Sequence, residues 1–287
     1  MSHTTAATPT TFAAPAPDAA PDDAVRGRLL WTDLMVPDVE AATRFYPAVT
    51  GWTLAPWAMG EGVPPYTMWT AGAAPVGGVM GMSEGEAAGG TPARWLAYLG
   101  TPDIDATYRD ALALGARGIV PPRDIPTVGR FAILADPQGA GFAVFQPSHA
   151  PAPRGGPLVD GAFSWFELGT TDAAAALAFY TRLFGWGLTE SMAMGPGHVY
   201  QMFGSDGTSG RTSVGAIYPA DLGGGEPHWL LYVRVADLTH ALDAVRRGGG
   251  RVLTEPHEIP GGDYIAHCAD PHGAEFALHA PAPRPAG

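Results

Sequence analysis

Two segments of this chain repeat one pattern. Residues 136–147 read DPQGAGFAVFQP, and residues 270–281, 134 positions later, read DPHGAEFALHAP. The same offset relates further landmarks along the chain: Trp31 with Trp165, Asp38 with Asp172, Phe45-Tyr46 with Phe179-Tyr180, Tyr66 with Tyr200, and Trp95 with Trp229. An offset that stays constant over about 120 residues indicates duplication of a whole domain. We therefore expect two similar domains.

Changes in composition mark the expected boundaries. The first 25 residues are rich in Ala, Pro and Thr and lack both a basic start and a long apolar run, which predicts a disordered tail and not a signal peptide. A stretch rich in Pro and Gly at 148–160 predicts a linker. The two domains are then expected at residues 26–147 and 161–281, with a short tail at 282–287.

Each half contains the same order of elements twice. In the first half, LLWTDLMV (29–36) alternates as a strand does, and Asp38 precedes a helix over 39–49 whose apolar residues share one face. Strands between Gly and Pro turns follow, and RWLAYLG (94–100) starts the series again. The pattern predicts two βαβββ modules in each domain and an α+β fold.

Charge and cysteine content limit the partners of the chain. A formal net charge of −12 and a pI near 5.0, without a basic stripe, argue against nucleic acid. The single cysteine, Cys268, excludes an intrachain disulfide and fits a reducing cytoplasm. No run of 18 apolar residues predicts a membrane span. All 16 basic residues are arginine, which indicates a GC-rich genome.

Two motifs resemble those of the vicinal oxygen chelate superfamily, which includes glyoxalases, bleomycin resistance proteins and dioxygenases. They are D-x-x-x-A-x-x-F-Y…G-W, which begins at Asp38 and Asp172, and A-D-P-x-G-A-x-F, which begins at Ala135 and Ala269. The chain is most similar to the tandem members of actinobacterial type. This resemblance implies that each domain forms a cupped, eight-stranded mixed sheet.

The resemblance also implies where metal ligands would lie, and none is present there. The first-strand ligand of the family falls on Trp31 and Trp165, the last-strand glutamate on Ala143 and Ala277, and the second-module ligand near Leu96 and Leu230. None of these side chains binds a divalent metal. We therefore expect no cofactor, with a divalent metal kept only as an alternative.

Side chains that alternate with these positions are expected to face the cup. In the second domain they are Glu167, His228, Tyr232, Arg234, Glu275 and His279, and in the first domain Asp33, Arg94, Tyr98, Gly100, Gly141 and Phe145. We expect Glu167, His228 and His279 to lie in one layer, and Asp33 to face Arg94. Two imidazoles and a carboxylate suit proton transfer or, in the alternative, a shifted metal site.

The candidate roles follow from this arrangement. Glu167, His228 and Tyr232 are the catalytic candidates, and Glu167, His228 and His279 are the ligands if a metal binds. The substrate-binding candidates are Trp31, Asp33, Arg94, Tyr98, Trp165, Arg234 and His279. Each has a structural alternative: His228 can solvate a strand end, Glu167 can make a structural hydrogen bond, and His279 can be an exposed residue near the end of its domain.

Other chemistry-bearing residues have weaker signals. His267 and Cys268 are neighbours on one strand, so one of them points inward and the other outward. Cys268 is expected to be an inert, packed thiol. Most of the repeated aromatic residues are expected to form core, with Trp31 and Trp165 as the exceptions that could stack on a flat ligand.

The leading hypothesis is a glyoxalase-like enzyme of secondary metabolism. It would act on a small aromatic or polyketide-like metabolite by isomerase, lyase or cyclase chemistry, without the usual metal site. The first alternative is a non-catalytic module that binds an antibiotic, as in bleomycin resistance. The second is a metal-dependent oxygenase that uses the shifted site. The expected partner is a small molecule. The protein itself is expected to be a monomer or a homodimer.

Overall fold

The computed structural model describes residues 25–57, 66–151, 158–205, 212–220 and 225–282. Its first domain contains β1 (Leu29–Val36), α1 (Val39–Thr50), β2 (Thr53–Trp57), β3 (Tyr66–Ala71), β4 (Ala74–Gly81), α2 (Glu84–Ala88), β5 (Arg94–Gly100), α3 (Ile104–Ala113), β6 (Arg117–Ile125), β7 (Gly129–Ala135) and β8 (Gly141–Pro147). Its second domain contains β9 (Phe163–Thr170), α4 (Ala173–Phe184), β10 (Gly187–Gly195), β11 (His198–Gly204), β12 (Gly215–Pro219), β13 (His228–Arg234), α5 (Leu238–Arg247), β14 (Arg251–Val252), β15 (His257–Glu258), β16 (Tyr264–Ala269) and β17 (Glu275–Ala280).

Three expected features fall mainly outside these ranges, and one of them is the C-terminal tail at 282–287, of which only residue 282 is described. The N-terminal tail, apart from Val25, and the middle of the linker are not among the described residues. Val25 is buried, with 2% of its surface exposed, and belongs to the packed part of the first domain.

Each domain is one mixed sheet made of two modules. The strand order is β2-β3-β4-β1-β5-β8-β7-β6 in the first sheet and β10-β11-β12-β9-β13-β17-β16-β14 in the second, where β15 also pairs with β16. The first strands of the two modules pair antiparallel, β1 with β5 and β9 with β13. The expected α+β class and the repeated modules are confirmed, with β15 as an additional short strand.

Aspartate residues start the long helices. The side chain of Asp38 accepts a hydrogen bond from the backbone N–H of Ala41, and Asp172 does the same with Ala175, 2.9 Å in each case. Such N-caps satisfy a backbone donor that has no partner inside the helix. Gly51 ends α1 with a φ of 75°, a left-handed conformation that favours glycine.

The helices are short. The longest that the structure describes, α1 and α4, have 12 residues each. A membrane span needs roughly 20 apolar residues, and no helix of the described part of the chain satisfies this requirement.

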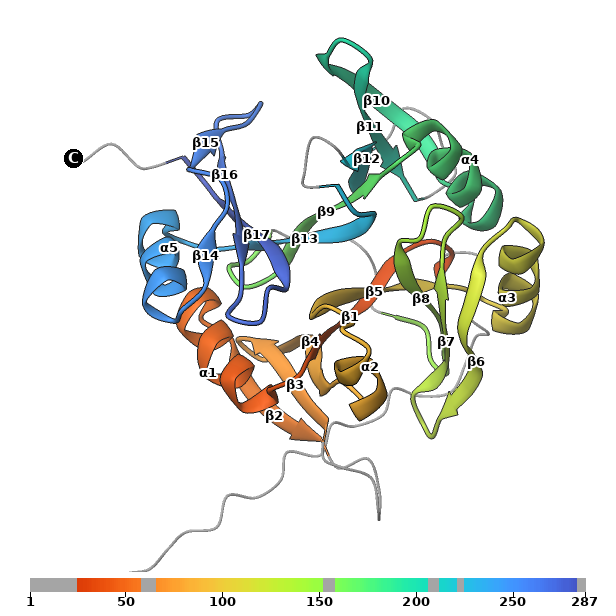
Figure 1. The fold of residues 1–287 in the computed structure, drawn as a ribbon, viewed down its shortest axis with the longest axis horizontal. Coiled ribbons are helices and arrows are strands. Elements are labelled where there is room, and N and C mark those ends of the chain that lie inside the picture. Colours follow the sequence, from red (N-terminus) through yellow and green to blue (C-terminus); the bar gives the residue numbers. More distant parts are fainter. Residues whose placement is uncertain (1–24, 58–65, 152–157, 206–211, 221–224, 283–287) are drawn as a thin grey trace, which may run out of the picture.

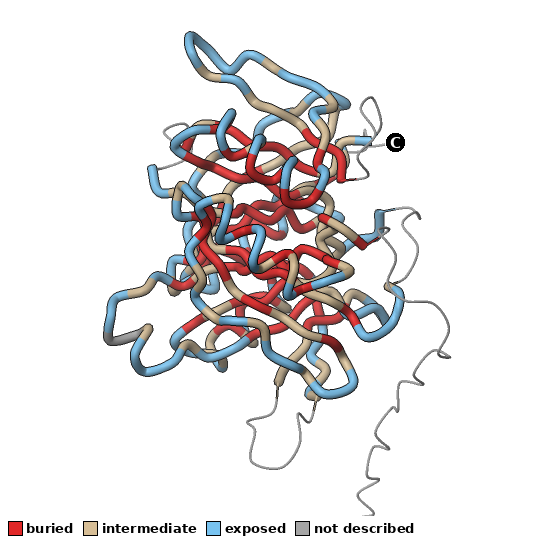
Figure 2. The backbone as a smooth tube through the Cα atoms, turned by 90° about the vertical axis from the view of Figure 1, so that its right-hand side faces the viewer, coloured by how far each residue is buried: buried red, intermediate tan, exposed pale blue. Residues whose placement is uncertain are grey.

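The two domains pack through the backs of their sheets. Helix α1 of the first domain lies beside α5 of the second, and α3 lies beside α4, with the sheets between them (Figure 1). One continuous cluster of buried side chains includes residues of both domains. Buried segments accordingly run through the middle of the molecule, and exposed segments lie at its periphery (Figure 2).

The repeated DP-x-G motif joins the domains. The hydroxyl of Tyr46 donates to Asp270 at 3.3 Å, and the hydroxyl of Tyr180 donates to Asp136 at 3.1 Å. Each aspartate also accepts hydrogen bonds from the backbone of its own turn, as Asp136 does from Ala140 at 2.9 Å. The two motifs that the repeats share are therefore partners across the interface, once in each direction.

A second pair of contacts follows the same symmetry. The indole nitrogen of Trp52 donates to the carbonyl oxygen of Gly161 at 2.7 Å, and that of Trp186 donates to Gly27 at 3.0 Å. Both glycines have positive φ, and a Cβ on Gly27 would lie 2.5 Å from the Trp186 nitrogen. Glycine is required there because the indole of the other repeat approaches the backbone closely.

Candidate functional site

Each sheet curves away from the other domain, so that its outer face forms an open cup (Figure 1). In the second cup, Trp165 on β9 lies opposite Tyr232 on β13, which lies beside Ala277 on β17. Glu167 lies one pleat further along β9, opposite Leu230. The floor of the cup is an apolar cluster that is separate from the main core and consists of Trp165, Leu230, Tyr232, Ile265 and Ala277.

Glu167 is the carboxyl group at the centre of this cup. Only 6% of the residue is exposed. One carboxylate oxygen accepts the hydroxyl of Tyr200, and the other accepts the hydroxyl of Tyr232 at 2.8 Å. Both oxygens of this buried acid therefore have tyrosine partners.

Trp165 determines the direction of one of these bonds. Its indole N–H donates to the hydroxyl oxygen of Tyr200 at 2.9 Å. Because an indole nitrogen can only donate, the single hydroxyl hydrogen of Tyr200 is left for Glu167. The tryptophan that occupies the position of a family metal ligand thus holds a tyrosine–carboxyl pair.

His267 extends the network on the other side. Its Nε2 lies 2.9 Å from the hydroxyl of Tyr232, which joins it through one phenol to Glu167. Burial lowers the pKa of His267 to about 4, so its imidazole is neutral at pH 7. Tyr232 has one hydrogen and two partners: it donates to Glu167 when that carboxyl is ionised, and to Nε2 of His267, in the tautomer that carries its hydrogen on Nδ1, when Glu167 is protonated. The hydrogen-bonded network of Glu167, Tyr232 and His267 therefore has two arrangements, one with Glu167 ionised and one with Glu167 protonated.

Burial also raises the pKa values of Glu167 and Tyr232. Desolvation raises the pKa of Glu167 above its usual range, and the hydrogen bonds from Tyr200, Tyr232 and Trp165 lower it in part. Burial also raises the pKa of Tyr232 well above its ordinary value. A carboxyl with a raised pKa beside neutral phenols and a neutral imidazole suits proton transfer near neutral pH.

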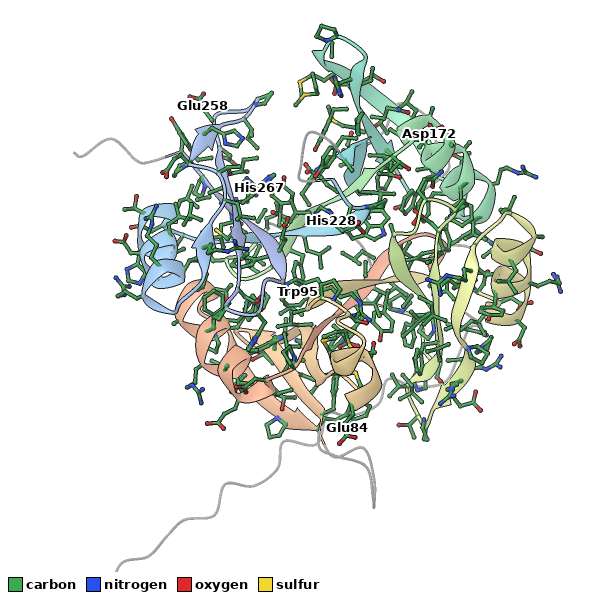
Figure 3. All side chains as sticks on the ribbon, in the orientation of Figure 1. Glu84, Trp95, Asp172, His228, Glu258 and His267 are labelled. Carbon is green, nitrogen blue, oxygen red and sulfur yellow. The ribbon has the colours of Figure 1, made fainter. Side chains whose placement is uncertain are left out.

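His228 belongs to a different part of the cup. Its Nε2 lies 3.4 Å from Glu275, and its Nδ1 lies 2.8 Å from the carbonyl oxygen of Glu226. The hydrogen bond with Glu275 raises the pKa of His228, and the same bond lowers the pKa of Glu275. His228 and His267 lie on different strands of the second sheet (Figure 3).

The first cup repeats the tryptophan–tyrosine–acid arrangement. The hydroxyl of Tyr66 donates to Asp33, and the indole of Trp31 donates to Tyr66 at 2.7 Å. Tyr98 also bonds to Asp33, whose pKa burial raises. Ile133 stands where the second cup has His267, so the first cup has the acid and its phenols without the imidazole.

A glycine makes room for this arrangement in the first cup. Gly78 on β4 lies beside Asp33, and a Cβ there would lie 1.9 Å from the hydroxyl oxygen of Tyr66. Any larger residue would displace the phenol from the carboxylate. Tyr66 reaches Asp33 because this position has no side chain.

The predicted layer of Glu167, His228 and His279 does not exist. The register places Glu167 opposite Leu230, His228 opposite Gly169, and His279 beside Arg234. In an antiparallel pair the residue that meets Glu167 is fixed by the register, and here it lies two positions after His228. The three side chains therefore lie at three levels of the cup.

The predicted contact between Arg94 and Asp33 is also wrong. Arg94 does not face Asp33, because it lies opposite Met35 and pairs with Glu86 at 3.0 Å. Arg234 lies with His279 near the start of β9, 3.4 Å from Asp160. The expected inward and outward directions of His267 and Cys268 are confirmed, because Cys268 is fully buried in the main core.

The cups do not fit the divalent metal that the fold family implies. The positions where the family resemblance implies metal ligands carry Trp165, Leu230 and Ala277 in the second cup, and these side chains pack against one another without a ligand atom for a metal. Trp31, Leu96 and Ala143 make the corresponding cluster in the first cup. Among the described residues, no three His, Cys, Asp or Glu side chains form a group that could hold a metal ion.

Tyr66, Tyr200 and His267 are site residues that the sequence did not point to, whereas Tyr98 and Tyr232 were predicted. Tyr66 and Tyr200 were assigned to core because they repeat, although their repetition together with Asp33 and Glu167 was the available signal. An acid and a phenol that recur at one offset indicate a conserved pair of contacts within a duplicated fold. No local signal joined His267 to Tyr232, because the two residues lie 35 positions apart.

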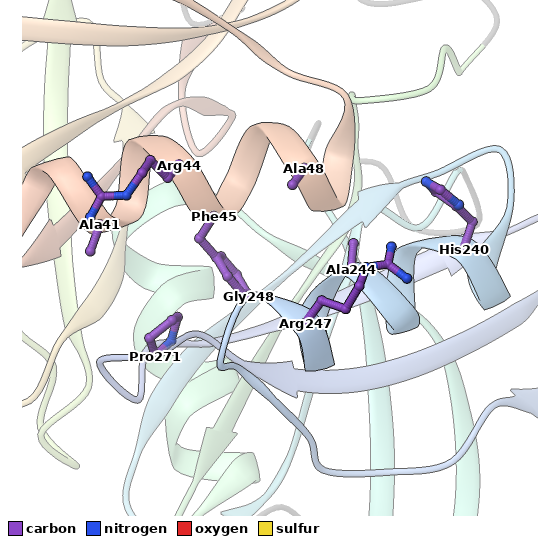
Figure 4. Close-up of a pocket in the computed structure, with 9 residues that line it drawn as sticks. All are labelled: Ala41, Arg44, Phe45, Ala48, His240, Ala244, Arg247, Gly248 and Pro271. Carbon is purple, nitrogen blue, oxygen red and sulfur yellow. The ribbon is translucent and has the colours of Figure 1, made fainter.

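A separate groove lies between α1 and α5 (Figure 4). It has a volume of about 620 Å³, and Phe45 projects from α1 toward Gly248, whose missing side chain makes room for the ring. Arg44 and Arg247 also line it, and Arg44 is paired with Glu40. None of the cup residues lines this groove.

Comparison with known proteins gives the family of the chain. Residues 28–144 and 162–278 each match the sequence profile of the Glyoxalase/Bleomycin resistance protein/Dioxygenase superfamily. CFP32 of Mycobacterium tuberculosis, whose name assigns it provisionally to the glyoxylases, is 32% identical over 88% of this chain and 95% of its own length. The anthracycline biosynthesis protein DnrV of Streptomyces peucetius is 30% identical over 88% of this chain and 92% of its own length.

Solved structures share the fold. The Mn(II)-bound glyoxalase from Novosphingobium aromaticivorans superimposes with a TM-score of 0.60 at 17% identity, covering 89% of this chain and 82% of that one. The 2,2',3-trihydroxybiphenyl 1,2-dioxygenase from Sphingomonas wittichii strain RW1 gives 0.61 at 14% identity, covering 89% and 90%. With two matching domains and the repeated βαβββ modules, this chain belongs to the Glyoxalase/Bleomycin resistance protein/Dioxygenase superfamily.

Proposed function

We propose that the protein is an enzyme that transfers protons on a small aromatic or polyketide-like metabolite in its second cup, with Glu167 as the general acid and base. The observation that carries this proposal is the buried carboxyl of Glu167 between the hydroxyls of Tyr200 and Tyr232, with His267 2.9 Å beyond Tyr232. Isomerisation, elimination and cyclisation all need a group that takes a proton from carbon and returns one.

The chemistry follows from the protonation of the network. Ionised Glu167 accepts a proton from a carbon next to a substrate carbonyl. Tyr232, which had donated to Glu167, then turns its hydrogen toward Nε2 of His267, which accepts it in the tautomer that carries its hydrogen on Nδ1, while the protonated carboxyl donates to the Tyr232 oxygen. Glu167 returns its proton to another atom of the substrate, which completes an isomerisation without net gain or loss of protons.

Aromatic walls favour a flat ligand. The rings of Tyr200 and Tyr218 stack with centroids 6.2 Å apart and planes 24° apart, and Trp165 lies on the floor. Stacking on such rings contributes on the order of 1 kcal/mol beyond the burial of area. The relationship to a protein named for anthracycline biosynthesis supports an aromatic polyketide as the substrate class.

The proposed reaction uses no metal at the inherited positions. Trp165, Leu230 and Ala277 offer no ligand atoms there, and the carboxyl that remains nearby is occupied by two phenols. The oxygenase alternative needed Glu167, His228 and His279 on one ion, and the register separates these three residues.

The test is the exchange of carbon-bound protons of 1-tetralone, an aromatic ketone, in D2O, followed by proton NMR. Wild-type protein is expected to accelerate the exchange of the protons next to the carbonyl. Glu167→Gln keeps the size of the side chain and removes the base, so the acceleration should fall by about 10²- to 10⁴-fold. Glu190→Gln, an exposed carboxyl on β10, is the matched control and should exchange at the wild-type rate.

Two results would count against the enzyme. Wild-type protein that binds the ketone without accelerating exchange has no base in reach of it. Equal rates for wild type and Glu167→Gln would mean that another group takes the proton.

A second candidate function is ligand binding without turnover. The observation that favours it is the presence of the same tryptophan–tyrosine–acid arrangement in both cups, although only the second has the histidine. Titration with 1,8-dihydroxyanthraquinone, read by tryptophan fluorescence, would then give two sites per chain and no chemical change in the ligand. Trp31→Phe and Trp165→Phe would each remove one site.

A further inference from the structure

One end of the second cup carries a polar contact set that the first cup lacks. In the first domain, Phe145 packs directly on Gly129, and Leu30 packs directly on Gly100. A Cβ on either glycine would lie within 2.9 Å of that neighbouring side chain. The second domain replaces all four residues at the constant offset of 134, with Ser164 for Leu30, Arg234 for Gly100, Asp263 for Gly129 and His279 for Phe145. The set is apolar in the first domain and polar in the second.

The polar set forms a hydrogen-bonded chain. Nδ1 of His279 lies 2.9 Å from the hydroxyl oxygen of Ser164, and Nε2 lies 2.8 Å from a carboxylate oxygen of Asp263. An ionised carboxylate only accepts hydrogen bonds, so Nε2 carries the hydrogen. In neutral His279 the bare nitrogen is then Nδ1, which faces the hydroxyl of Ser164. This is the relation between nucleophile, base and orienting acid in serine hydrolases.

A β-bulge directs Ser164 into this position. The register runs from Trp165 opposite Tyr232 to Phe163 opposite Val233, which leaves Ser164 without a partner on β13. Bulges redirect side chains and are common beside active sites. Among the residues that the structure describes, the only other partner of the Ser164 hydroxyl is the carbonyl oxygen of Tyr232, in a long contact of 3.4 Å.

A nearby arginine and the low exposure of His279 complete the arrangement of Ser164, His279 and Asp263. The guanidinium of Arg234 lies 4.0 Å from Asp263 and 3.4 Å from Asp160, so both carboxylates have a cation nearby. The side chain of His279 is 13% exposed, which shields its two hydrogen bonds from water.

Ser164 also borders a hollow that can hold a small molecule. A cavity of about 690 Å³ lies between the first strands of the two domains, and its lining includes Leu30, Trp31, Leu158, Phe163, Ser164 and Trp165. This volume lies within the usual range of small-molecule sites. The lining also includes Arg28, Thr32, Ser205, Thr212 and Ser213, and the apolar side chains next to Ser164 can hold an apolar acyl group.

We propose that Ser164, His279 and Asp263 form a second catalytic site, a serine nucleophile for small apolar esters. The Ser164 oxygen adds to the ester carbonyl while its hydrogen passes to Nδ1 of His279, and the alcohol leaves with that proton. Water then attacks the acyl-Ser164 and gives a proton to Nδ1. Release of the acid returns the hydrogen to Ser164, so one ester and one water give one acid and one alcohol.

The experiment is active-site labelling with an alkyl fluorophosphonate, in which the Ser164 oxygen displaces fluoride, followed by peptide mapping in a mass spectrometer. Wild-type protein should carry one adduct, on Ser164, and should hydrolyse p-nitrophenyl butyrate. Ser164→Ala should lose both, and His279→Gln should slow both by about 10²-fold or more, the usual contribution of a general base. Ser191→Ala on β10 should label as the wild type does.

A second variant guards against loss of folding. The combination Ser164→Leu, Arg234→Gly, Asp263→Gly and His279→Phe restores the contact set of the first domain, so it should keep the wild-type circular dichroism and lose the adduct. No adduct on Ser164 in folded wild-type protein would overturn the proposal, as would a labelling rate unaffected by His279→Gln. Ketone exchange by Glu167 is read separately, so failure of one proposal leaves the other testable.

Discussion

The carboxyl group of Glu167 is buried in the folded protein, although its charged form is better solvated in water. Its residue is 6% exposed, and burial raises its pKa above the ordinary value of 4.5. A raised pKa means that the folded state binds the proton more tightly than the unfolded state does. The folded protein therefore loses stability as the pH rises from about 4.5 through the folded-state pKa of this group.

Glu167→Gln should remove this loss, because the amide does not ionise. Its NH₂ can donate to the hydroxyl of Tyr232, which then donates to His267, while its oxygen accepts from Tyr200. We expect the variant to melt higher than wild type at pH 7 by roughly 2–4 °C, the shift that about 1 kcal/mol produces in a protein of this size. The difference should shrink toward pH 4, and thermal melting across this range is the measurement. A variant that melts lower than wild type at pH 7 would show that the carboxylate stabilises the fold.

At the scale of single elements, local sequence decides where helices begin. Asp38 was expected to precede a helix and Asp172 is its equivalent in the second repeat, and each accepts a backbone hydrogen bond at the start of its helix. The strand expected at 29–36 is β1, and the helix expected at 39–49 is α1, which extends by one residue to Thr50. These signals depend on near neighbours and do not require knowledge of the packing.

Asp38→Ala should therefore lower the free energy of unfolding by about 1 kcal/mol, the usual contribution of such a cap. Denaturant unfolding followed by circular dichroism measures this change. Asp243→Ala, an exposed residue on α5 whose ion pair with Arg246 contributes little, serves as the control and should stay within about 0.5 kcal/mol of wild type. Equal losses in the two variants would mean that the Asp38 side chain contributes no more than a surface charge.

At the scale of the whole molecule, the two domains share one core. The ring of Tyr46 contacts Trp95 edge-on at 5.3 Å and Phe276 of the other domain at 5.3 Å. Trp95 in turn contacts Phe163 of the second domain at 5.8 Å and lies between the two sheets (Figure 3). Aromatic surface of this size is not left in water, so each repeat depends on the other.

Tyr46→Phe tests this interface with the loss of one oxygen. The hydroxyl accepts the indole N–H of Trp95 at 3.1 Å and donates to Asp270 at 3.3 Å, so its removal leaves a buried donor without a partner. We expect the free energy of unfolding to fall by about 1–3 kcal/mol. Tyr180→Phe removes the corresponding hydroxyl of the second domain, which donates to Asp136 of the first, and should also lower the free energy of unfolding. Tyr264→Phe, whose hydroxyl contacts exposed Glu258, is the control. The shared interface would be of little consequence if all three variants unfolded alike.

The sequence by itself determined the duplication, the order of elements and the family. It also determined that the inherited metal positions carry indole and aliphatic side chains, because residue identity at a motif position is a local fact. The tertiary structure decided which groups meet Glu167. Tyr200 and His267 come from β11 and β16, which lie on opposite sides of β9 in the sheet, and neither strand has a local signal that points to the carboxyl.

The pleat explains why the remaining predictions failed. A strand exposes every second residue to one face, so a wrong register moves the expected partners by a whole level. Register in turn depends on β-bulges such as the one at Ser164, and the sequence periodicity of β9 does not indicate where this bulge lies. The sequence named Glu167, Tyr232 and His279 as cup residues, and only the pairing of distant strands gave the first two a shared network and the third a serine and an aspartate.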